Sequence, residues 1–169
     1  MSQQIILRAG VAGAPDISLR PITESAAATL GSDLANIQPW TRYQVTAHAL
    51  TAFLSDHEPG APRYEIRLGD ALAGGMVLRL NWMRGPYLQF LGLLPDFQHQ
   101  GIGDVVLTWL EDTAKKSEDR NLWVAASEFN SRALSFYESH GFERVATIDD
   151  LVRDGINEVL MRKKIRAST

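Results

Sequence analysis

Residues 98–103 read Gln-His-Gln-Gly-Ile-Gly, a glycine-rich turn of the kind that can hold a phosphate group. The preceding residues 87–94 are apolar and aromatic and predict a strand, while residues 104–111 carry apolar side chains at helical spacing. Glycine permits tight turning and close ligand approach. The first N–H groups of the following helix lack internal acceptors and lie at the positive end of its dipole. The segment therefore predicts an anion site built from backbone amides, with a simple helix-starting loop as the plain alternative.

Two common nucleotide-binding motifs are excluded for this turn. The dinucleotide fingerprint requires a third glycine three residues after Gly103, and position 106 is Val. The phosphate loop ending in Gly-Lys-Ser/Thr is absent from the chain. The interpretation left for this turn is a diphosphate site formed by backbone amides, with a glutamine as the first residue of the turn.

Length and composition are those of a globular protein with one domain. The chain has 169 residues, of which 45% are hydrophobic and 22% charged. The net charge of −3 argues against a general nucleic-acid binder. Without cysteine there is no disulfide, thiolate nucleophile or thiolate metal site. With neither a membrane-length apolar run nor a secretory signal, we expect a cytoplasmic protein that binds no metal and no membrane.

The pattern of turns and apolar residues predicts a mixed α/β chain. Residues 1–16 are expected to form a flexible extension or an edge strand, and residues 17–169 a single domain. Thr23 is the expected N-cap of the first helix, and Gly141 the C-terminal glycine of the last. The other expected helices cover 45–54, 102–117 and 131–140, and the expected strands cover 17–22, 63–68, 72–80, 86–94, 122–126, 142–148 and 157–163.

A second motif supports a family resemblance. Residues 130–142 read Asn-Ser-Arg-Ala-Leu-Ser-Phe-Tyr-Glu-Ser-His-Gly-Phe, which is similar to the Asn-x-x-Ala-x-x-(aromatic/Leu)-Tyr-x-x-x-Gly-Phe signature of the GNAT superfamily of N-acetyltransferases. The order βααβββαβαββ, with Gln-x-x-Gly-x-Gly after the fourth strand, also resembles that family. The resemblance rests on residues 63–163 and is only architectural over residues 17–57.

The resemblance implies a fold and a cosubstrate. The expected fold is a mixed, mostly antiparallel sheet of six to seven strands with about four helices, in which a splayed strand pair forms a cleft for acetyl-CoA. Backbone groups of Leu91 and Leu93 would bind the pantetheine arm. The backbone amides of the turn from His99 to Asp104 would hold the pyrophosphate. The residues expected to bind the cofactor besides Leu91 and Leu93 are Gln98, His99, Gln100, Gly101, Ile102, Gly103, Asp104 and Asn130.

Acetyl transfer to an amine needs an acid for the leaving thiolate, and Tyr137 matches the family's position for it. The plain alternative is a tyrosine that only packs its helix on the sheet. Asn130 is equally interpretable as a helix cap, a role compatible with a CoA contact. Phe136 and Phe142 are expected in the core.

The general base is left open. The strand position at which ribosomal-protein N-terminal acetyltransferases carry a glutamate is Ala125 here. Glu128 lies in a loop, Gln89 cannot act as a base, and His99 and His140 are expected to be exposed, so proton removal through ordered water is the default expectation.

The turn differs from a typical phosphate site in two respects, and two further segments could contribute to the acceptor site. Asp104 follows the second glycine, where a carboxylate would repel a pyrophosphate unless it points away or takes the helix-start donors, and residues 98–100 contain no Arg or Lys. Residues 39–43 carry aromatic side chains and are expected either in one wall of the acceptor site or in the core. Residues 149–155 are expected to form an acidic loop that is solvated or attracts a cationic amine.

The function expected from these features is transfer of acetyl from acetyl-CoA to a primary amine, directly in a ternary complex because no cysteine can form an acyl-enzyme. The acceptor, a small molecule or a peptide, is not identified by the sequence. The alternative is a non-catalytic CoA-binding or regulatory module, and a different nucleotide-binding α/β protein is a weaker third interpretation. A homodimer formed through the apolar run 5–7 is left open.

Overall fold

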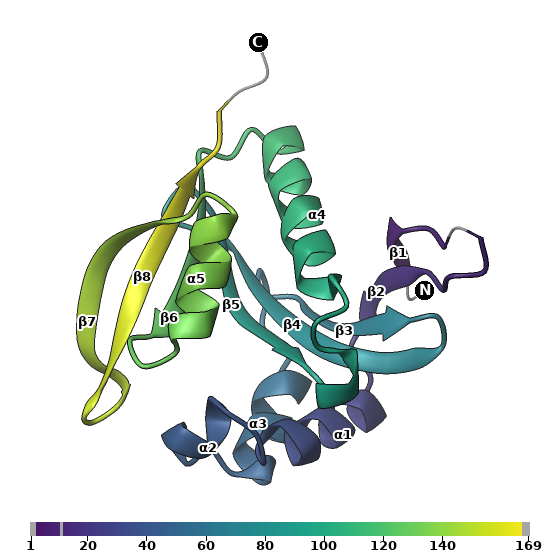
Figure 1. The fold of residues 1–169 in the computed structure, drawn as a ribbon, viewed down its shortest axis with the longest axis horizontal. Helices are drawn as coiled ribbons and strands as arrows, with labels where there is room; N and C mark the ends of the chain where they lie inside the picture. The colour runs from purple at the N-terminus through teal and green to yellow at the C-terminus, as the bar shows by residue number, and fades with distance from the viewer. Residues whose placement is uncertain (1–2, 11, 167–169) are drawn as a thin grey trace. The chain divides into compact units, whose positions relative to one another are not determined.

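The computed structural model describes residues 3–10 and 12–166 (Figure 1). Predictions that involve residues 1–2, 11 and 167–169 lie outside the described residues. Within them are eight strands, five α-helices and one 3-10 helix: β1 (Ile5–Arg8), β2 (Ile17–Pro21), α1 (Glu24–Leu34), α2 (Trp40–Tyr43), α3 (Ala47–Ser55), β3 (Arg63–Leu68), β4 (Ala71–Trp82), β5 (Gly85–Leu93), η1 (Pro95–Phe97), α4 (Ile102–Lys116), β6 (Asn121–Ser127), α5 (Ser131–Ser139), β7 (Glu143–Arg153) and β8 (Ile156–Lys164).

The strands form one sheet in the order β1-β2-β3-β4-β5-β6-β8-β7. The described pairings β1–β2, β2–β3, β3–β4, β6–β8 and β7–β8 are antiparallel, whereas β5 and β6 are parallel, as expected for two strands joined through a helix. The predicted mixed, mostly antiparallel α/β fold is thus confirmed. The numbers of strands and helices are slightly higher than predicted, because β1 and the single-turn helix α2 add to them.

The chain divides into two compact units, which are described separately. The first comprises residues up to Leu78 together with Phe90–Trp109, and the second comprises Arg79–Gln89 together with residues from Leu110 onward. The prediction of one domain over residues 17–169 stays a prediction.

In the first unit, α1 and α3 pack on each other and on one side of the strands (Figure 1). Both helices begin at a threonine whose hydroxyl accepts a backbone N–H: Thr23 from Ala26 at 3.1 Å, as predicted, and Thr46 from Ala49 at 3.0 Å. Their apolar stripes and the sheet enclose one core cluster, formed by Ala27, Leu30, Leu34, Leu50, Leu54, Val77 and Phe90.

In the second unit, β8 lies between β6 and β7, and α5 packs on β6 (Figure 1). The predicted acidic loop over 149–155 is wrong, because β7 continues to Arg153. Asp150 adopts a left-handed φ of 54°, and its Oδ1 accepts the N–H of Gly155 at 2.6 Å. This irregularity absorbs the extra residues within the strand and leaves a tight turn before β8.

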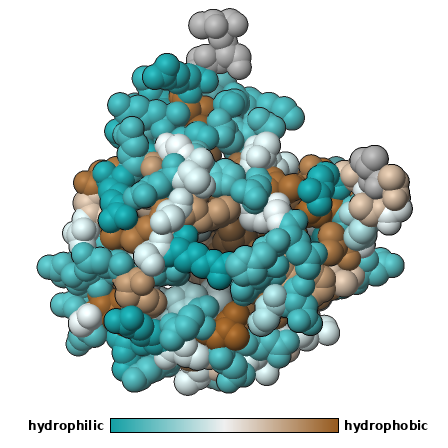
Figure 2. Space-filling model, viewed as in Figure 1, coloured by the Kyte–Doolittle hydropathy of each residue, from teal (hydrophilic) through white to brown (hydrophobic). Residues whose placement is uncertain are grey.

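The surface of the described residues is mainly hydrophilic on the face shown in Figure 2, with apolar side chains in separate patches. Within residues 3–10 and 12–166, six large apolar residues are exposed: Ile6, Leu80, Met83, Val145, Leu151 and Val152. No described helix combines the length and the apolar character needed to cross a membrane.

Candidate active site

The glycine-rich turn lies between β5 and α4, and its glutamine side chains bind the turn itself. Gln98 Nε2 donates to the Leu93 carbonyl oxygen at 3.0 Å, and Gln100 Nε2 donates to the Asp96 carbonyl oxygen at 2.6 Å. Gln98 therefore ties the turn to the end of β5, and Gln100 ties it to the 3-10 helix.

The backbone of the turn is left-handed at two positions before α4. His99 and Gly101 both adopt left-handed φ values, 63° and 78°. The first α-helical hydrogen bond joins the Val105 N–H to the Gly101 carbonyl oxygen at 3.2 Å. The N–H groups of Ile102 and Gly103 consequently precede the internal bonding of α4 and lie at its positive end. A diphosphate bound on these groups stays a prediction.

Asp104 is exposed in the first turn of the same helix. Its Oδ2 lies 3.9 Å from the point that a Cβ on Gly101 would occupy. The carboxylate thus extends toward the start of α4 instead of away from it. There it interacts favourably with the positive end of the helix dipole.

Leu91 and Leu93 occupy the last part of β5. The Phe90 ring lies 5.4 Å from the Trp40 ring, so residue 90 faces the α1–α3 side of the first unit. By strand alternation, Leu91 and Leu93 face the other side, and both are half-buried. The Leu93 carbonyl oxygen already accepts from Gln98. Backbone contacts of Leu91 and Leu93 with pantetheine remain predictions.

Asn130 caps α5 in the second unit. Its Oδ1 accepts the N–H of Ala133 at 3.1 Å, and its own N–H donates to the Ser127 carbonyl oxygen at 2.9 Å. The helix-cap interpretation of Asn130 is confirmed, and its contact with CoA stays a prediction. Gly141 ends the helix at a left-handed φ of 86°, also as predicted.

Tyr137 lies on the buried face of α5, with a relative exposure of 9%. Its ring contacts Phe136 and Phe142, at centroid distances of 5.4 and 5.7 Å. Burial raises the pKa of the Tyr137 phenol above its ordinary value of 10.0, and the charge of Tyr87 raises it further. The phenol is therefore protonated at neutral pH and can donate a proton.

Comparison with known proteins identifies the family of this site. The model of the acetyltransferase (GNAT) family matches residues 27–142, a range that includes the glycine-rich turn, Asn130 and Tyr137. The chain belongs to the GNAT acetyltransferase family. The predicted resemblance and the predicted enzyme class are thereby confirmed.

Curated relatives match over a short segment only. The [ribosomal protein bS18]-alanine N-acetyltransferase of Escherichia coli K12 is 41% identical over 54 residues. That segment is 32% of this chain and 36% of the relative, so the match spans about a third of the relative's length. A match of this length does not show that this GNAT protein acts on the same acceptor as the relative.

Solved structures of low sequence identity share the fold over most of the chain. The ribosomal-protein-S18-alanine N-acetyltransferase from Escherichia coli superposes with a TM-score of 0.70 at 19% identity, covering 90% of this chain and 96% of the other. A spermidine N-acetyltransferase from Vibrio cholerae, in complex with CoA and spermine, superposes with a TM-score of 0.69 at 14% identity. The match covers 88% of this chain and 95% of the other. A streptothricin acetyltransferase from Bacillus anthracis, described as putative and solved with acetyl coenzyme A, gives 0.56 at 19% identity over 65% of each chain.

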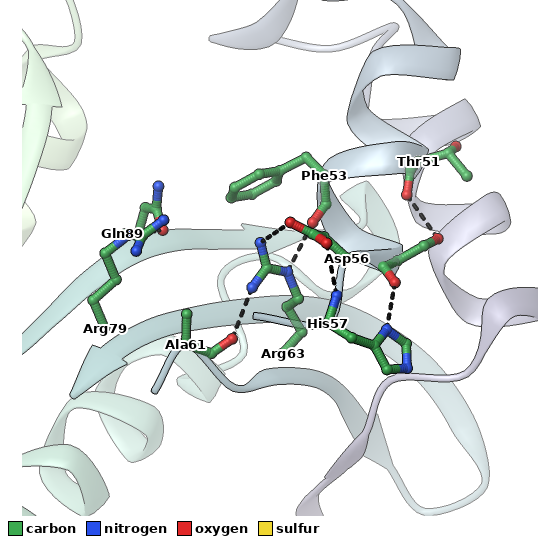
Figure 3. Close-up of polar contacts among 9 residues, drawn as sticks. Thr51, Phe53, Asp56, His57, Ala61, Arg63, Arg79 and Gln89 are labelled. Carbon is green, nitrogen blue, oxygen red and sulfur yellow. Dashed lines mark hydrogen bonds and ion pairs between the residues drawn. The ribbon is translucent and has the colours of Figure 1, made fainter. Parts of the chain in front are cut away.

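The residues considered as a base in this GNAT protein are mostly occupied or exposed. Glu128 is exposed and accepts from Asn157 Nδ2 at 3.2 Å. Gln89 Oε1 accepts from Arg79 Nε at 2.9 Å (Figure 3). His99 is exposed as predicted, whereas His140 is half-buried, with its ring 4.8 Å from that of Phe136. The expectation that His140 is exposed is therefore wrong, because α5 packs its last turn against this ring.

Two residues of the second unit escaped the sequence analysis, Tyr87 and Glu158. Glu158 is a buried residue of β8, with a relative exposure of 5%. Tyr87 was assigned only to an apolar strand. The signal that could have found Glu158 is a carboxylate placed directly before the apolar residues Val159 and Leu160 in a strand.

The segment 39–43 belongs to the core side of the first unit. Trp40 packs on Phe90, and the following helix α3 is fixed by Arg63 (Figure 3). The guanidinium of Arg63 donates to the Phe53 carbonyl oxygen at 2.8 Å and to the Ala61 carbonyl oxygen at 2.7 Å. Core packing of the aromatic side chains is therefore shown for Trp40, and a role in an acceptor wall stays a prediction.

A metal-binding cluster is not found over residues 3–10 and 12–166, where no group of three or more His, Asp or Glu side chains could hold an ion.

Proposed function

We propose that this GNAT protein is an N-acetyltransferase that moves the acetyl group of acetyl-CoA to a primary amine by direct transfer in a ternary complex. Tyr137 carries the proposal. A buried phenol, held protonated and mounted on a capped helix, is the acid that the leaving thiolate requires. The missing cysteine supports direct transfer, because no thiol can form an acyl-enzyme.

The glycine-rich turn would bind the cosubstrate. In this proposal the backbone amides from His99 to Asp104 hold the pyrophosphate, with Gln98 and Gln100 keeping the turn in shape through their side chains. Leu91, Leu93 and Asn130 would supply further contacts to CoA. Acetyl-CoA supplies the activated acetyl thioester when bound.

The acceptor is proposed only as a class, a primary amine on a small molecule or a peptide. The names of similar proteins include an enzyme that acetylates a ribosomal-protein alanine and enzymes that acetylate spermidine. Both are primary amines, and this shared chemistry supports the class. We place the reaction in the cytoplasm as part of the same proposal, consistent with the cysteine-free sequence.

The experiment measures release of free CoA thiol from acetyl-CoA with a panel of amines that includes spermidine and an alanine-initiated peptide. We expect turnover by the wild-type protein and a loss of about 100-fold or more in kcat for Tyr137→Phe, with the Kd for CoA unchanged. Phenylalanine keeps the ring packing, so the variant should fold.

A second candidate function is favoured by one observation, the exposed Asp104 carboxylate over a cradle without a basic residue. This arrangement suits a protein that binds CoA weakly, as a regulatory module. Binding of CoA without turnover on any amine of the panel would favour the module over the enzyme. Thermal stabilisation by ATP or NAD but not by CoA would exclude both.

A further inference from the structure

The turn between β4 and β5 is built from residues that are unfavourable for its backbone conformation. Met83 and Arg84 are the two residues between Trp82, the end of β4, and Gly85, the start of β5. Both adopt left-handed φ values, 45° and 66°. A two-residue turn of this kind favours Asn-Gly, because bulky side chains are strained in the left-handed region. The side chains of Met83 and Arg84 are therefore retained here at a conformational cost.

The hydrogen bonds that hold this turn use its main chain. The Met83 carbonyl oxygen accepts the Trp123 Nε1–H at 3.0 Å. The Arg84 carbonyl oxygen accepts the N–H groups of Arg120 and Asn121 at 3.1 and 3.2 Å. Carbonyl oxygens are present whatever residues occupy the two positions, while Met83 is 49% exposed and Arg84 is also exposed. The backbone contacts thus leave the choice of Met and Arg unexplained, and strain retained at exposed residues favours a role outside the fold.

Three aromatic rings lie directly beside the turn. The Trp82 ring stacks on Tyr87 at a centroid distance of 4.7 Å and meets Trp123 edge to face at 5.4 Å. Leu80, two residues before Trp82 and so on the same face of β4, is 44% exposed. Leu80, Trp82 and Met83 form an apolar surface on a packed aromatic base, here called the hairpin patch.

Arg162 continues the hairpin patch onto β8. It lies opposite Trp123 in the ladder between β6 and β8, so the two side chains share a face of the sheet. The Arg162 guanidinium stands over the Trp123 ring at 5.8 Å, a cation–π contact that holds the charge beside the apolar surface. A guanidinium over a ring still presents N–H donors at its edge, where a carboxylate can bind them.

Both helices of the second unit are attached to the other face of these strands. Lys163 and Met161 are each one residue from the arginine on β8 and so point away from the hairpin patch. Lys163 donates to Glu111, in the part of α4 that belongs to this unit. Arg144, opposite Met161, donates to Glu138 of α5 at 2.6 Å. Among the described residues of the second unit, neither helix covers the hairpin patch.

The charged side chains around the hairpin patch are mainly cationic. Arg162 and Lys164 are two residues apart on β8 and share its face, and Arg84 adds a third positive charge from the turn. Two carboxylates lie on the same face of β7 and β8. Glu143 is exposed opposite Arg162, whereas Glu158 is buried four residues away along β8. The exposed surroundings of the patch, over these described strands and the turn, are therefore net positive.

This combination of side chains fits a segment of another polypeptide that carries apolar and acidic residues. Trp, Tyr, Met and Arg are the residue types enriched in protein interfaces, and Trp, Tyr and Arg contribute most of the binding energy there. An apolar centre with a cationic rim complements apolar residues flanked by carboxylates. Because the turn is already held by hydrogen bonds, little ordering of the patch is needed on binding.

Two other occupants fit the hairpin patch less well. A second copy of the chain, docked by two-fold symmetry, would place the cationic rims of the two patches against each other. A nucleic acid needs exposed ring faces on which its bases stack. Here Trp82 and Tyr87 stack on each other, Trp123 is only 7% exposed, and the chain has a net charge of −3.

We propose that the hairpin patch is a docking surface for an acidic polypeptide segment. The apolar residues of the segment lie on Leu80, Trp82 and Met83, and its carboxylates bind the guanidinium groups of Arg84 and Arg162. This surface is an interaction site in its own right and does not depend on the proposed acetyl transfer.

The first test uses a fluorescent peptide in which two leucines are flanked on both sides by glutamates. Anisotropy should show saturable binding to the full-length protein, and the double variant Met83→Asn/Arg84→Gly should raise the Kd about 10-fold or more. In urea denaturation the same variant should be at least as stable as wild type, because Asn-Gly is favoured in this turn. An unchanged Kd, absence of binding to wild type, or a loss of binding accompanied by a loss of stability would overturn the proposal.

The contribution of charge is tested at Arg162. Arg162→Gln should raise the Kd about 5- to 10-fold at low salt, with a smaller difference at high salt, and Arg162→Lys should keep part of the affinity. Lys116→Gln removes an exposed charge from α4, and Val152→Ser removes an apolar side chain of β7 that is 62% exposed. Both controls should leave the Kd within about 2-fold of wild type; losses equal to that of Arg162→Gln would show nonspecific binding and overturn the proposal.

Other probes separate the classes of partner. A peptide with lysines in place of the glutamates should bind about 10-fold more weakly or less, and equal binding would refute the role of charge. Tighter binding of single-stranded oligouridylate than of the acidic peptide would identify a nucleic-acid surface instead. Sedimentation of wild type as a dimer, and of the double variant as a monomer, would identify an interface between copies. Because these measurements need no turnover, their outcome is independent of whether the proposed acetyltransferase function holds.

Discussion

Glu111 on α4 receives hydrogen bonds from two lysines, one of them Lys163 on β8. The Lys163 Nζ lies 2.5 Å from Glu111 Oε2, and Lys115 Nζ lies 2.9 Å from Oε1. Lys163 lies 52 positions after Glu111 in the sequence, whereas Lys115 lies four positions after it on the same helix. Burial alone would raise the pKa of Glu111, but the hydrogen bonds and charges of Lys163 and Lys115 outweigh it and lower that pKa.

The lowered pKa predicts how the stability conferred by Glu111 depends on pH. A carboxylate whose pKa falls on folding stabilises the protein above its unfolded pKa of about 4.5 and loses this effect as the pH falls through the folded value. Glu111→Gln should therefore reduce the free energy of unfolding by about 0.5 to 1 kcal/mol at pH 7. Urea denaturation should show this difference shrinking below pH 4.5; a difference that grows in acid would contradict the prediction.

Arg63 predicts a larger effect in the first unit. It is 7% exposed and donates to two carbonyl oxygens, while its ion pair with Asp56 is long, at 3.7 Å, and Asp56 is 61% exposed. Arg63→Met should cost about 2 to 3 kcal/mol, because it leaves the carbonyls of Phe53 and Ala61 without their donor. Asp56→Asn, the control, should cost less than about 1 kcal/mol. Equal urea midpoints for the two variants would show that the carbonyl contacts do not matter.

Helix ends could be predicted from sequence because their chemistry is local. Thr23 and Asn130 accept N–H groups three residues ahead, and Gly141 takes the left-handed conformation after a helix, so each signal lies within a few residues of its effect. The glycine-rich turn was recognisable for the same reason. Its internal contacts, from Gln98 to Leu93, were not predicted, because glutamine rotamers depend on the folded turn.

Features set by pairing between distant segments escaped prediction. The extension of β7 past Asp149 depends on β8 and on the irregularity at Asp150, which no local pattern of charged residues indicates. The burial of Glu158 likewise depends on its place opposite Ser127. A charged residue in an amphipathic strand is ordinarily assigned to the solvent face, and only the register shows otherwise.

Tyr137 predicts an unusual resistance of activity to alkaline pH. Its pKa lies above the ordinary 10.0, so the phenol keeps its proton, and the proposed acid stays functional, as the pH rises to 10. The kcat for acetyl transfer should therefore stay level between pH 8 and 10. Above pH 10, where Tyr87 can itself ionise, its charge raises the pKa of Tyr137, so Tyr87→Phe should move the alkaline loss of activity to lower pH. An alkaline decline that is unchanged in Tyr87→Phe would disprove the coupling.

Asp104 predicts opposite effects on cosubstrate binding and on stability. Its carboxylate is exposed in the first turn of α4 and extends toward Gly101, where it stabilises the helix dipole and repels a pyrophosphate. Asp104→Asn should lower the Kd for CoA by about 2- to 5-fold at low salt and lower the free energy of unfolding by about 0.3 to 1 kcal/mol. Calorimetric titration in increasing salt should show the gain in affinity disappearing, since salt screens exposed charges. Asp112→Asn is the matched control, because Asp112 is exposed on the same helix about 12 Å further along it. Weaker CoA binding in Asp104→Asn would mean that this carboxylate shapes the turn instead of opposing the anion.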